Sequence, residues 1–256
     1  MTEGLSPRPT YDRIARLYDV DMAANMRFDD VAFYAEVCRA AGRRVLELGC
    51  GNGRILLDLI ASGIDAVGVD CSQAMLMELS RKAGARALSP QVCLMDARAL
   101  GFGASFGVVL CPFSLVTYMT TADDLARLTS EAWGVLEPAG IVVLDAFVPQ
   151  PSVYSDEFRP DYERPYGRGS LCRSKRIRRL SPTINRIERC YEIRGESGAL
   201  VERIETVEDI HVFAPPELLD VMRDAGFKVE SEWWNYAARW PVADGQFYTL
   251  IGRRGR

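Results

Sequence analysis

Three glycines at alternate positions follow a short apolar segment early in the chain. They are Gly49, Gly51 and Gly53, and Arg54 stands where a dinucleotide-binding G-x-G-x-x-G loop would have its last glycine. Bare backbone at such a turn lets a ligand lie against amide groups at the positive end of the next helix. Glu47 would crowd a pyrophosphate. A zwitterionic amino-acid tail fits the loop better, because its carboxylate would meet the amides and its ammonium an acidic surrounding.

Two aspartates end the next two apolar segments. Asp70 lies 19 positions beyond Gly51, an offset at which a carboxylate can accept both ribose hydroxyls of an adenosine. Asp96 can bind an adenine amino group while the N–H of Ala97 meets a ring nitrogen. Helix capping is the structural alternative for each aspartate. Ligands of open α/β sheets bind at the carboxyl ends of strands, so these residues predict one nucleoside-binding edge.

The elements that must hold these residues alternate between strands and helices. Short, continuously apolar strands are expected at 44–48, 66–69, 92–95, 106–111 and 141–144. Helices are expected at 54–61, after Ser72 and after Thr121, where a hydroxyl side chain can cap the first turn. Such strands alternating with helices indicate a parallel sheet that is covered on both faces.

The two ends of this region have different patterns. Residues 11–41 have apolar residues at helical spacing, and the arginine-rich stretch after Phe147 alternates as antiparallel strands do. Strands are expected there at 171–179, 185–193 and 200–212, followed by a helix at 217–225 and strands at 228–233 and 246–252. We predict an N-terminal helical segment (1–42), a doubly wound α/β domain (43–147 and 214–256) and an antiparallel β insert (148–213).

As a set, the motifs resemble those of the class I S-adenosylmethionine (SAM)-dependent methyltransferases. VLELGCGNGR resembles their motif I, VGVDCSQAML the acidic motif that follows, and MDA the adenine-contacting motif. LCPFSLVTYMTTADDL and LEPAGIVVLDAF resemble the fourth- and fifth-strand segments of small-molecule members, with Ala139 in place of one glycine. YDRIARLYD resembles the start of many metabolite methyltransferases. The resemblance covers residues 11–147 nearly continuously.

This resemblance implies an α/β fold of the Rossmann-like class I methyltransferase type. Its sheet would be mostly parallel, seven-stranded and doubly wound, with the antiparallel β insert after the fifth strand. The N-terminal segment (1–42) would be a helical lid over the cofactor, residues 43–147 and 214–256 the SAM-binding domain, and the insert (148–213) the wall of a substrate chamber. The cofactor would be SAM, and S-adenosylhomocysteine the product. The residues implied to bind the cofactor, together with Glu47, are Tyr11, Tyr18, Gly49, Gly51, Asp70, Cys71, Met75, Asp96, Ala97 and Pro112.

Within that set, the resemblance gives each residue a position. Cys71 and Met75 would flank the adenine, and the backbone carbonyl of Pro112 would accept from its amino group. Tyr11 and Tyr18 would lie over the methionine end. Their seven-residue spacing equally suits two aromatic residues that pack in a core.

Candidate acceptor-site residues follow the fourth expected strand. Phe113, Ser114 and Tyr118 would face the transferred methyl group. Tyr118 and His211, the single histidine, are the catalytic candidates if the reaction needs a base, although a lone histidine in a strand is more often structural. The scarcity of bases favours methylation at nitrogen of a compact, largely uncharged or weakly basic metabolite in secondary metabolism. O- or C-methylation, a peptide amino terminus, and a SAM-binding protein without catalysis are the alternatives.

The overall charge argues against a nucleic-acid substrate. The net charge is −4 and the isoelectric point about 5.3, so the molecule has no field that attracts polyanions. The segment Cys111–Ser114 also departs from the N/D-P-P-Y/F pattern of base-amino methyltransferases. A basic run at 173–179 is expected to be neutralised by cross-strand pairing with the acidic strand at 202–209.

The cysteines and the apolar segments restrict the class of protein further. Seven scattered cysteines without a C-x-x-C pair suit neither zinc nor a disulfide framework, so we expect no metal and a cytoplasmic protein with reduced thiols. No window approaches about 18 uninterrupted apolar residues, so no membrane span is expected. The expected partner is a small-molecule acceptor, and the chain would act as a monomer or homodimer.

Overall fold

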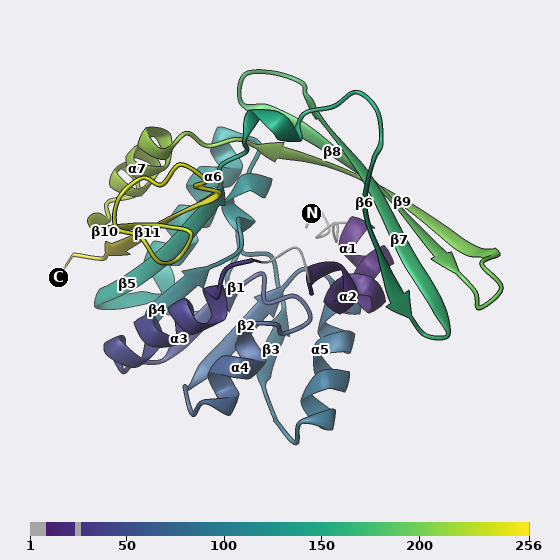
Figure 1. Ribbon diagram of the computed structural model, residues 1–256. Coiled ribbons are helices and arrows are strands. Elements are labelled where there is room, and N and C mark those ends of the chain that lie inside the picture. Colours follow the sequence, from purple (N-terminus) through teal and green to yellow (C-terminus); the bar gives the residue numbers. More distant parts are fainter. Residues whose placement is uncertain (1–8, 24–26, 256) are drawn as a thin grey trace, which may run out of the picture.

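The large sheet has the expected topology. The computed structural model describes residues 9–23 and 27–255 and contains a seven-stranded sheet in the order β10-β11-β5-β4-β1-β2-β3 (Figure 1). The strands are β1 (Val45–Leu48), β2 (Ala66–Asp70), β3 (Gln91–Leu94), β4 (Phe106–Cys111), β5 (Leu136–Phe147), β10 (Lys228–Trp234) and β11 (Phe247–Arg253). The first five run parallel, whereas β11 is antiparallel to β5 and β10. The predicted mostly parallel, doubly wound sheet is confirmed.

Helices cover both faces of this sheet. They are α3 (Asp30–Ala41), α4 (Leu56–Ala61), α5 (Gln73–Ala85), α6 (Ala122–Val135) and α7 (Pro215–Asp224). One core cluster joins α6 and α7 to one face, and a second joins α3, α4 and α5 to the other. The expected caps are present, since Ser72 Oγ accepts from Met75 N at 3.2 Å and Thr121 Oγ1 from Asp124 N at 3.1 Å. Burial on both faces explains why every residue of β1 and β4 is buried and why all of them except Glu47 are apolar.

The N-terminal helical pattern divides into separate pieces. It comprises α1 (Pro9–Ile14), the 3-10 turn η1 (Ala15–Leu17), α2 (Tyr18–Met22) and, after a break, α3. Ile14 and Leu17 pack against the insert strands, whereas α3 packs on the large sheet. Periodicity alone could not locate this break, because both parts have apolar residues at helical spacing and differ only in what they pack against.

The insert forms a separate antiparallel sheet in the order β6-β7-β8-β9. Its strands are β6 (Arg159–Tyr166), β7 (Gly169–Arg179), β8 (Ile184–Arg194) and β9 (Leu200–His211), and Figure 1 shows α1 and α2 beside this sheet. The sequence did not predict β6, which contains Pro160 and Pro165. Prolines are compatible with an edge strand, where one side of the backbone needs no partner. The three-part division into domains stays a prediction.

The basic run on β7 is paired, but not with the expected strand. Strand β8 lies between β7 and β9, so the acidic side chains of β9 are not the neighbours of β7. Arg176 and Arg178 instead bind Glu188 of β8 at 2.7 and 2.8 Å. Arg173 binds Asp161 of β6. The sequence therefore correctly predicted that acidic residues neutralise the basic run. The predicted acidic partners were wrong, because the spacing of charges does not indicate the order of the strands in the sheet.

The described residues contain neither a membrane-spanning helix nor a cluster of metal-ligating side chains. No helix within 9–23 and 27–255 is long and apolar enough to cross a membrane. In the same residues, no group of three or more histidine, cysteine, aspartate or glutamate side chains is arranged to hold a metal ion.

Candidate functional site

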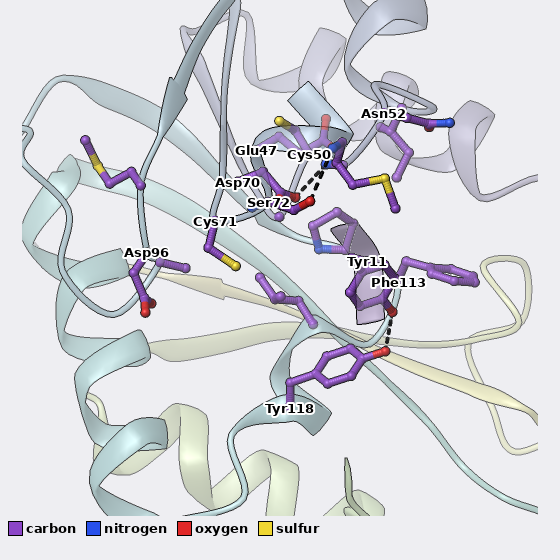
Figure 2. A pocket seen from close by; sticks show the side chains of 18 of the residues that line it. Tyr11, Glu47, Cys50, Asn52, Asp70, Cys71, Ser72, Asp96, Phe113 and Tyr118 are labelled. Atoms are coloured by element: carbon purple, nitrogen blue, oxygen red, sulfur yellow. Dashed lines mark hydrogen bonds between the residues drawn. The ribbon is translucent and has the colours of Figure 1, made fainter. Parts of the chain in front are cut away.

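A cavity lies at the carboxyl ends of β1, β2 and β4, between the large sheet and α1–α2 (Figure 2). The predicted residues that line it are Tyr11, Tyr18, Glu47, Gly49, Gly51, Asp70, Cys71, Met75, Asp96, Ala97, Pro112, Phe113 and Tyr118. Lining residues that the sequence reasoning missed are Cys50, Asn52, Arg54, Ile55, Ser72, Met95, Arg98, Leu115 and Met119. The structure thus brings most of the predicted set to one cavity; the role of each residue stays a prediction.

The glycine loop needs its glycines for backbone reasons. Gly49, Gly51 and Gly53 have φ values of 68°, 53° and 79°, in the left-handed region that disfavours residues with a Cβ. A Cβ on Gly53 would also come within 2.8 Å of Leu79. The loop can therefore turn sharply between β1 and α4 and leave its backbone exposed to the cavity.

Asp70 fastens this loop to the end of β2. Its carboxylate accepts from Gly51 N and Ser72 N, both at 2.8 Å, as Figure 2 shows. Burial raises the pKa of Asp70 above its ordinary value, although these two amide bonds oppose the rise. An ionised carboxylate has about four lone-pair sites, so the two amides leave acceptor capacity for hydroxyl groups of a ligand.

Glu47 is a buried carboxyl group with one oxygen that lacks a partner among the described residues. It is 2% exposed, and the oxygen without a hydrogen bond is Oε2. Burial raises its pKa to about 8, although the nearby Arg54 guanidinium, which Asp30 binds at 2.8 and 2.6 Å, opposes the rise. Asn52 Oδ1 in the same wall is also buried and unpartnered. Orphaned polar atoms of this kind fit a bound ligand that supplies an ammonium and a hydrogen-bond donor.

Asp96 is held by a neighbour that the sequence reasoning overlooked. The Arg98 side chain donates to Asp96 through Nε at 3.0 Å and Nη2 at 2.6 Å, and its Nη1 binds Asp124 at 2.5 Å. Arg98 also lines the cavity. The sequence could have predicted this pairing, because the side chain of an arginine two positions after a strand-end aspartate can fold back and bind the carboxylate.

A pair of tyrosine hydroxyls joins the N-terminal segment to the loop after β4. Tyr11 Oη and Tyr118 Oη are hydrogen-bonded, and the two rings meet edge to face with centroids 6.0 Å apart (Figure 2). Tyr18 packs against Tyr11 at 6.2 Å. Burial and the neighbouring Tyr118 raise the pKa of Tyr11, so its hydroxyl stays protonated at neutral pH.

Two aspartates attach the N-terminal segment to the large domain. Asp12 Oδ1 accepts from Ser72 Oγ at 2.6 Å, directly behind the Asp70 turn. Asp19 Oδ1 accepts from Asn52 Nδ2 at 2.8 Å and from Lys82 Nζ at 2.7 Å. The segment thereby covers the glycine loop through polar contacts at its surface.

The loop after β4 is shaped by a residue that the sequence did not single out. Phe113 and Ser114 have φ values of 52° and 61°, which side chains with a Cβ rarely adopt. Asp145, fully buried at the end of β5, accepts from Ser114 N at 2.6 Å, from Phe113 N at 3.1 Å and from the Tyr34 hydroxyl. Burial raises the pKa of Asp145 to about 6 despite these bonds.

Two predicted residues lie outside the lining of the cavity. Ser114 is 8% exposed and its hydroxyl is buried without a partner, because its backbone turns the side chain into the protein. His211 ends β9 near α7, where its Nε2 lies 2.7 Å from Glu217 Oε1 and its ring packs on Phe213. The structure therefore does not bring His211 to the reacting edge, and its proposed role as a base has no geometric support.

A second cleft adjoins the first at Tyr118, which lies in the wall of both. It runs along the edge of β9, beside α1, and we call it the β9 cleft. Its lining comprises Thr10, Arg13, Tyr118, Thr120, Glu205, Thr206, Val207, Glu208 and Asp209. This is the part of the site that the insert contributes.

Comparison with known proteins places the chain among methyltransferases. Residues 45–140 match the family described as methyltransferase domain. The chain is 30% identical over 230 residues to the demethylmenaquinone methyltransferase of Thermus thermophilus, which covers 88% of this chain and 90% of that protein. The chain aligns with only 54% of the length of another relative, YqeM of Bacillus subtilis.

Two further similarities cover the insert as well. The chain is 26% identical over 227 residues to a dTDP-4-amino-2,3,4,6-tetradeoxy-D-glucose N,N-dimethyltransferase of Saccharopolyspora spinosa, covering 84% of this chain and 86% of that one. The crystal structure of a SAM-dependent methyltransferase from Clostridium acetobutylicum superposes with a TM-score of 0.80 at 17% identity, over 96% of this chain and 100% of the other. The likeness in fold therefore extends over both sheets.

Proposed function

The chain belongs to the class I SAM-dependent methyltransferases, and from this membership we propose that it transfers the methyl group of SAM to an amino nitrogen of a small molecule. The observation that carries the choice of nitrogen is the acidic β9 cleft, which adjoins the cofactor cavity at Tyr118. Its carboxylates suit an acceptor that arrives as an ammonium. The Saccharopolyspora spinosa relative, named for N,N-dimethylation of an amino sugar, supports the same choice.

The cavity residues fit SAM in charge and in hydrogen bonding. The unpartnered Glu47 carboxyl would bind the ammonium of the methionine part, and the remaining lone pairs of Asp70 would accept the ribose hydroxyls. Asp96, with Ala97 beside it, would read the adenine edge. When bound, SAM supplies an electrophilic methyl group on a sulfonium. The chain's own task is then to align the acceptor and exclude water.

Alignment is the main contribution that these residues can make. In-line displacement requires the nitrogen lone pair to face the methyl carbon, and holding two reactants in that geometry can lower a barrier by roughly 7–11 kcal/mol. The bonded hydroxyls of Tyr11 and Tyr118 close the cavity where it meets the β9 cleft. Both hydroxyls can exchange hydrogen bonds with the acceptor molecule, and the two tyrosines are not proposed as bases.

Glu208 is the residue best placed to handle the proton of the acceptor. It is 7% exposed and lies in the wall of the β9 cleft that also contains Tyr118. An ammonium has no free lone pair, so it must lose one proton before attack. We propose that Glu208 holds the ammonium and receives that proton. The nitrogen would then take up the methyl group that bound SAM supplies and leave as a methylated ammonium, and S-adenosylhomocysteine would be the product.

Turnover assays with matched acceptors test this function. The purified protein is incubated with SAM and with sets of amino sugars, their hydroxyl counterparts and a demethylated quinol, and S-adenosylhomocysteine is measured. We expect turnover with the amino sugars and little or none with their hydroxyl counterparts. Turnover with the quinol and none with any amine would contradict the proposal and favour an acceptor of the kind in the name of the Thermus thermophilus relative, a demethylmenaquinone methyltransferase.

A further inference from the structure

Arg189 stands out on the sheet that walls off the acceptor. It is half-buried on β8, and in the antiparallel register it lies directly opposite Lys175 of β7 and Thr206 of β9. Opposite residues in such a ladder point to the same face. The neighbouring row on that face contains Tyr191, which packs against Ile14 and Leu17. Arg189 therefore lies on the face of the insert sheet that packs against α1.

This cation has no carboxylate partner among the residues that the structure describes. Other arginines of the insert are paired, for example Arg186 with Asp209 at 2.7 Å and Arg176 with Glu188 at 2.7 Å. Burial opposes the charge of Arg189, but the surrounding Tyr191, Tyr118, Tyr11 and Asp21 together raise its pKa. A partly buried charge without an ion pair is costly, which makes it a candidate to meet a charged ligand.

Thr206 provides an independent sign of a ligand at the same place. Its side chain is 3% exposed, and its Oγ1 has no hydrogen-bond partner in the described residues. It lines the β9 cleft together with Tyr118. A hydroxyl buried without a partner is rare in folded proteins, so a ligand oxygen that pairs with it would remove a cost.

We propose that Arg189 and Thr206 bind an acidic oxygen group, a phosphate or a carboxylate, on the acceptor molecule. This rests on the proposed function and makes its substrate more specific: the acceptor has both an amine and an anion. The guanidinium fork suits either group, because it can donate two parallel hydrogen bonds to two oxygens. The largely uncharged metabolite that the sequence suggested is thereby replaced.

Other charged side chains on this face are bound to partners other than Arg189. Lys175 in the same row is bound to Asp161 at 3.1 Å. Asp21 is already bound by Arg173. Glu208 lies two residues beyond Thr206 on β9, on the same face. The residue proposed to bind the amine is therefore next to, but distinct from, the residues proposed to bind the anion.

Binding of simple anions tests the site without knowledge of the acceptor. Calorimetry with the S-adenosylhomocysteine-saturated protein uses inorganic phosphate, pyrophosphate and acetate as probes. We expect saturable binding of at least one, and the preferred probe distinguishes a phosphate-bearing from a carboxylate-bearing acceptor. Binding should weaken about tenfold or more in R189M, because a charged hydrogen bond contributes roughly 1.5–3 kcal/mol. The matched control R186M, on the outer face of β8, should bind as wild type does.

Thr206→Val separates a ligand-binding role from a structural one. Loss of an unpartnered hydroxyl should leave the melting temperature unchanged or raise it, whereas anion affinity should fall several-fold. Absence of anion binding in the wild type, or equal affinity in R189M and R186M, would overturn the inference. Neither result bears on amine turnover or on S-adenosylhomocysteine affinity, so the anion site can fail while the proposed N-methylation stands.

Discussion

At the scale of single residues, the site depends on carboxyl groups that burial has changed. Glu47 and Asp145 are both buried at strand ends, and both have a raised pKa, but their surroundings differ. Asp145 is satisfied by two amides and a tyrosine hydroxyl, whereas one oxygen of Glu47 has no partner among the described residues. The first therefore suits a structural role and the second a ligand.

Glu47 predicts a dependence on pH. Its folded pKa of about 8 exceeds the unfolded value of about 4.3, so its contribution to stability is present below the unfolded pKa and is lost as pH rises through 8. The ligand-free wild type should thus lose more stability between pH 5 and pH 8 than E47Q does. S-adenosylhomocysteine should reduce this loss, because its ammonium compensates the carboxylate. Thermal unfolding over pH measures both effects, and identical pH profiles for the two proteins would refute the assignment.

Asp145 predicts an effect on turnover more than on cofactor binding. In D145N one oxygen is replaced by an amide donor, so at least one of the Phe113 and Ser114 amides loses its acceptor. We expect a loss of stability of about 1–3 kcal/mol and a shifted Tyr118. The value of kcat should fall while S-adenosylhomocysteine affinity changes less than about threefold. A large loss of cofactor affinity with normal kcat would show that Asp145 acts elsewhere.

At the scale of elements, the N-terminal segment is attached by contacts that can open. Asp12 and Asp19 connect α1 and α2 to Ser72, Asn52 and Lys82 at the surface of the large domain. Tyr11 adds a hydrogen bond to the loop after β4. Segments with few buried contacts open at low free energy, and this is what a lid over a cofactor requires.

The lid interpretation predicts a ligand-dependent change in hydrogen exchange. Amides of residues 11–22 should exchange faster without S-adenosylhomocysteine than with it, while those of β4 stay protected in both states. Asp12→Ala should raise KM for SAM and reduce the difference in exchange, because the bond to Ser72 is lost. Asp123→Ala, an exposed residue of α6 paired with Arg127, is the matched control. Equal exchange in both states would identify the segment as fixed scaffold.

At the scale of the whole molecule, a buried ion pair joins the N-terminal segment to the insert. Arg173 of β7 is 6% exposed and binds both Asp21 of α2 and Asp161 of β6. Tyr162 and Tyr191 donate further hydrogen bonds to Asp21, at 2.7 and 3.1 Å. The two sheets are thus linked through the N-terminal segment as well as through the covalent chain.

Removal of one partner should show the strength of this link. Arg173→Met leaves Asp21 buried with an uncompensated charge, which typically costs about 3–5 kcal/mol. R173M/D21N should recover part of that loss, since position 21 no longer carries a charge and Asp161 keeps Lys175 as a partner. Urea unfolding of the wild type, both single variants and the double variant measures the coupling. Additive losses in the double variant would mean that the pair does not link the two elements.

The sequence by itself determined the parallel sheet and the cofactor edge. Strand periodicity, helix caps and a glycine loop are local, and they place Asp70 and Asp96 at strand ends whatever the rest of the chain does. The carboxyl ends of adjacent parallel strands then meet at one edge. For this reason the predicted cofactor residues line a single cavity.

Only the tertiary structure decided which distant residues meet. The order of strands in the insert separates β7 from β9. Packing between distant segments places His211 beside Glu217 and brings the charge of Arg189 near Tyr11 and Tyr118. It also brings Asp145 of β5 under the loop after β4. These pairings depend on packing between segments that are tens of residues apart in the chain, and local propensity and periodicity do not record which segments those are.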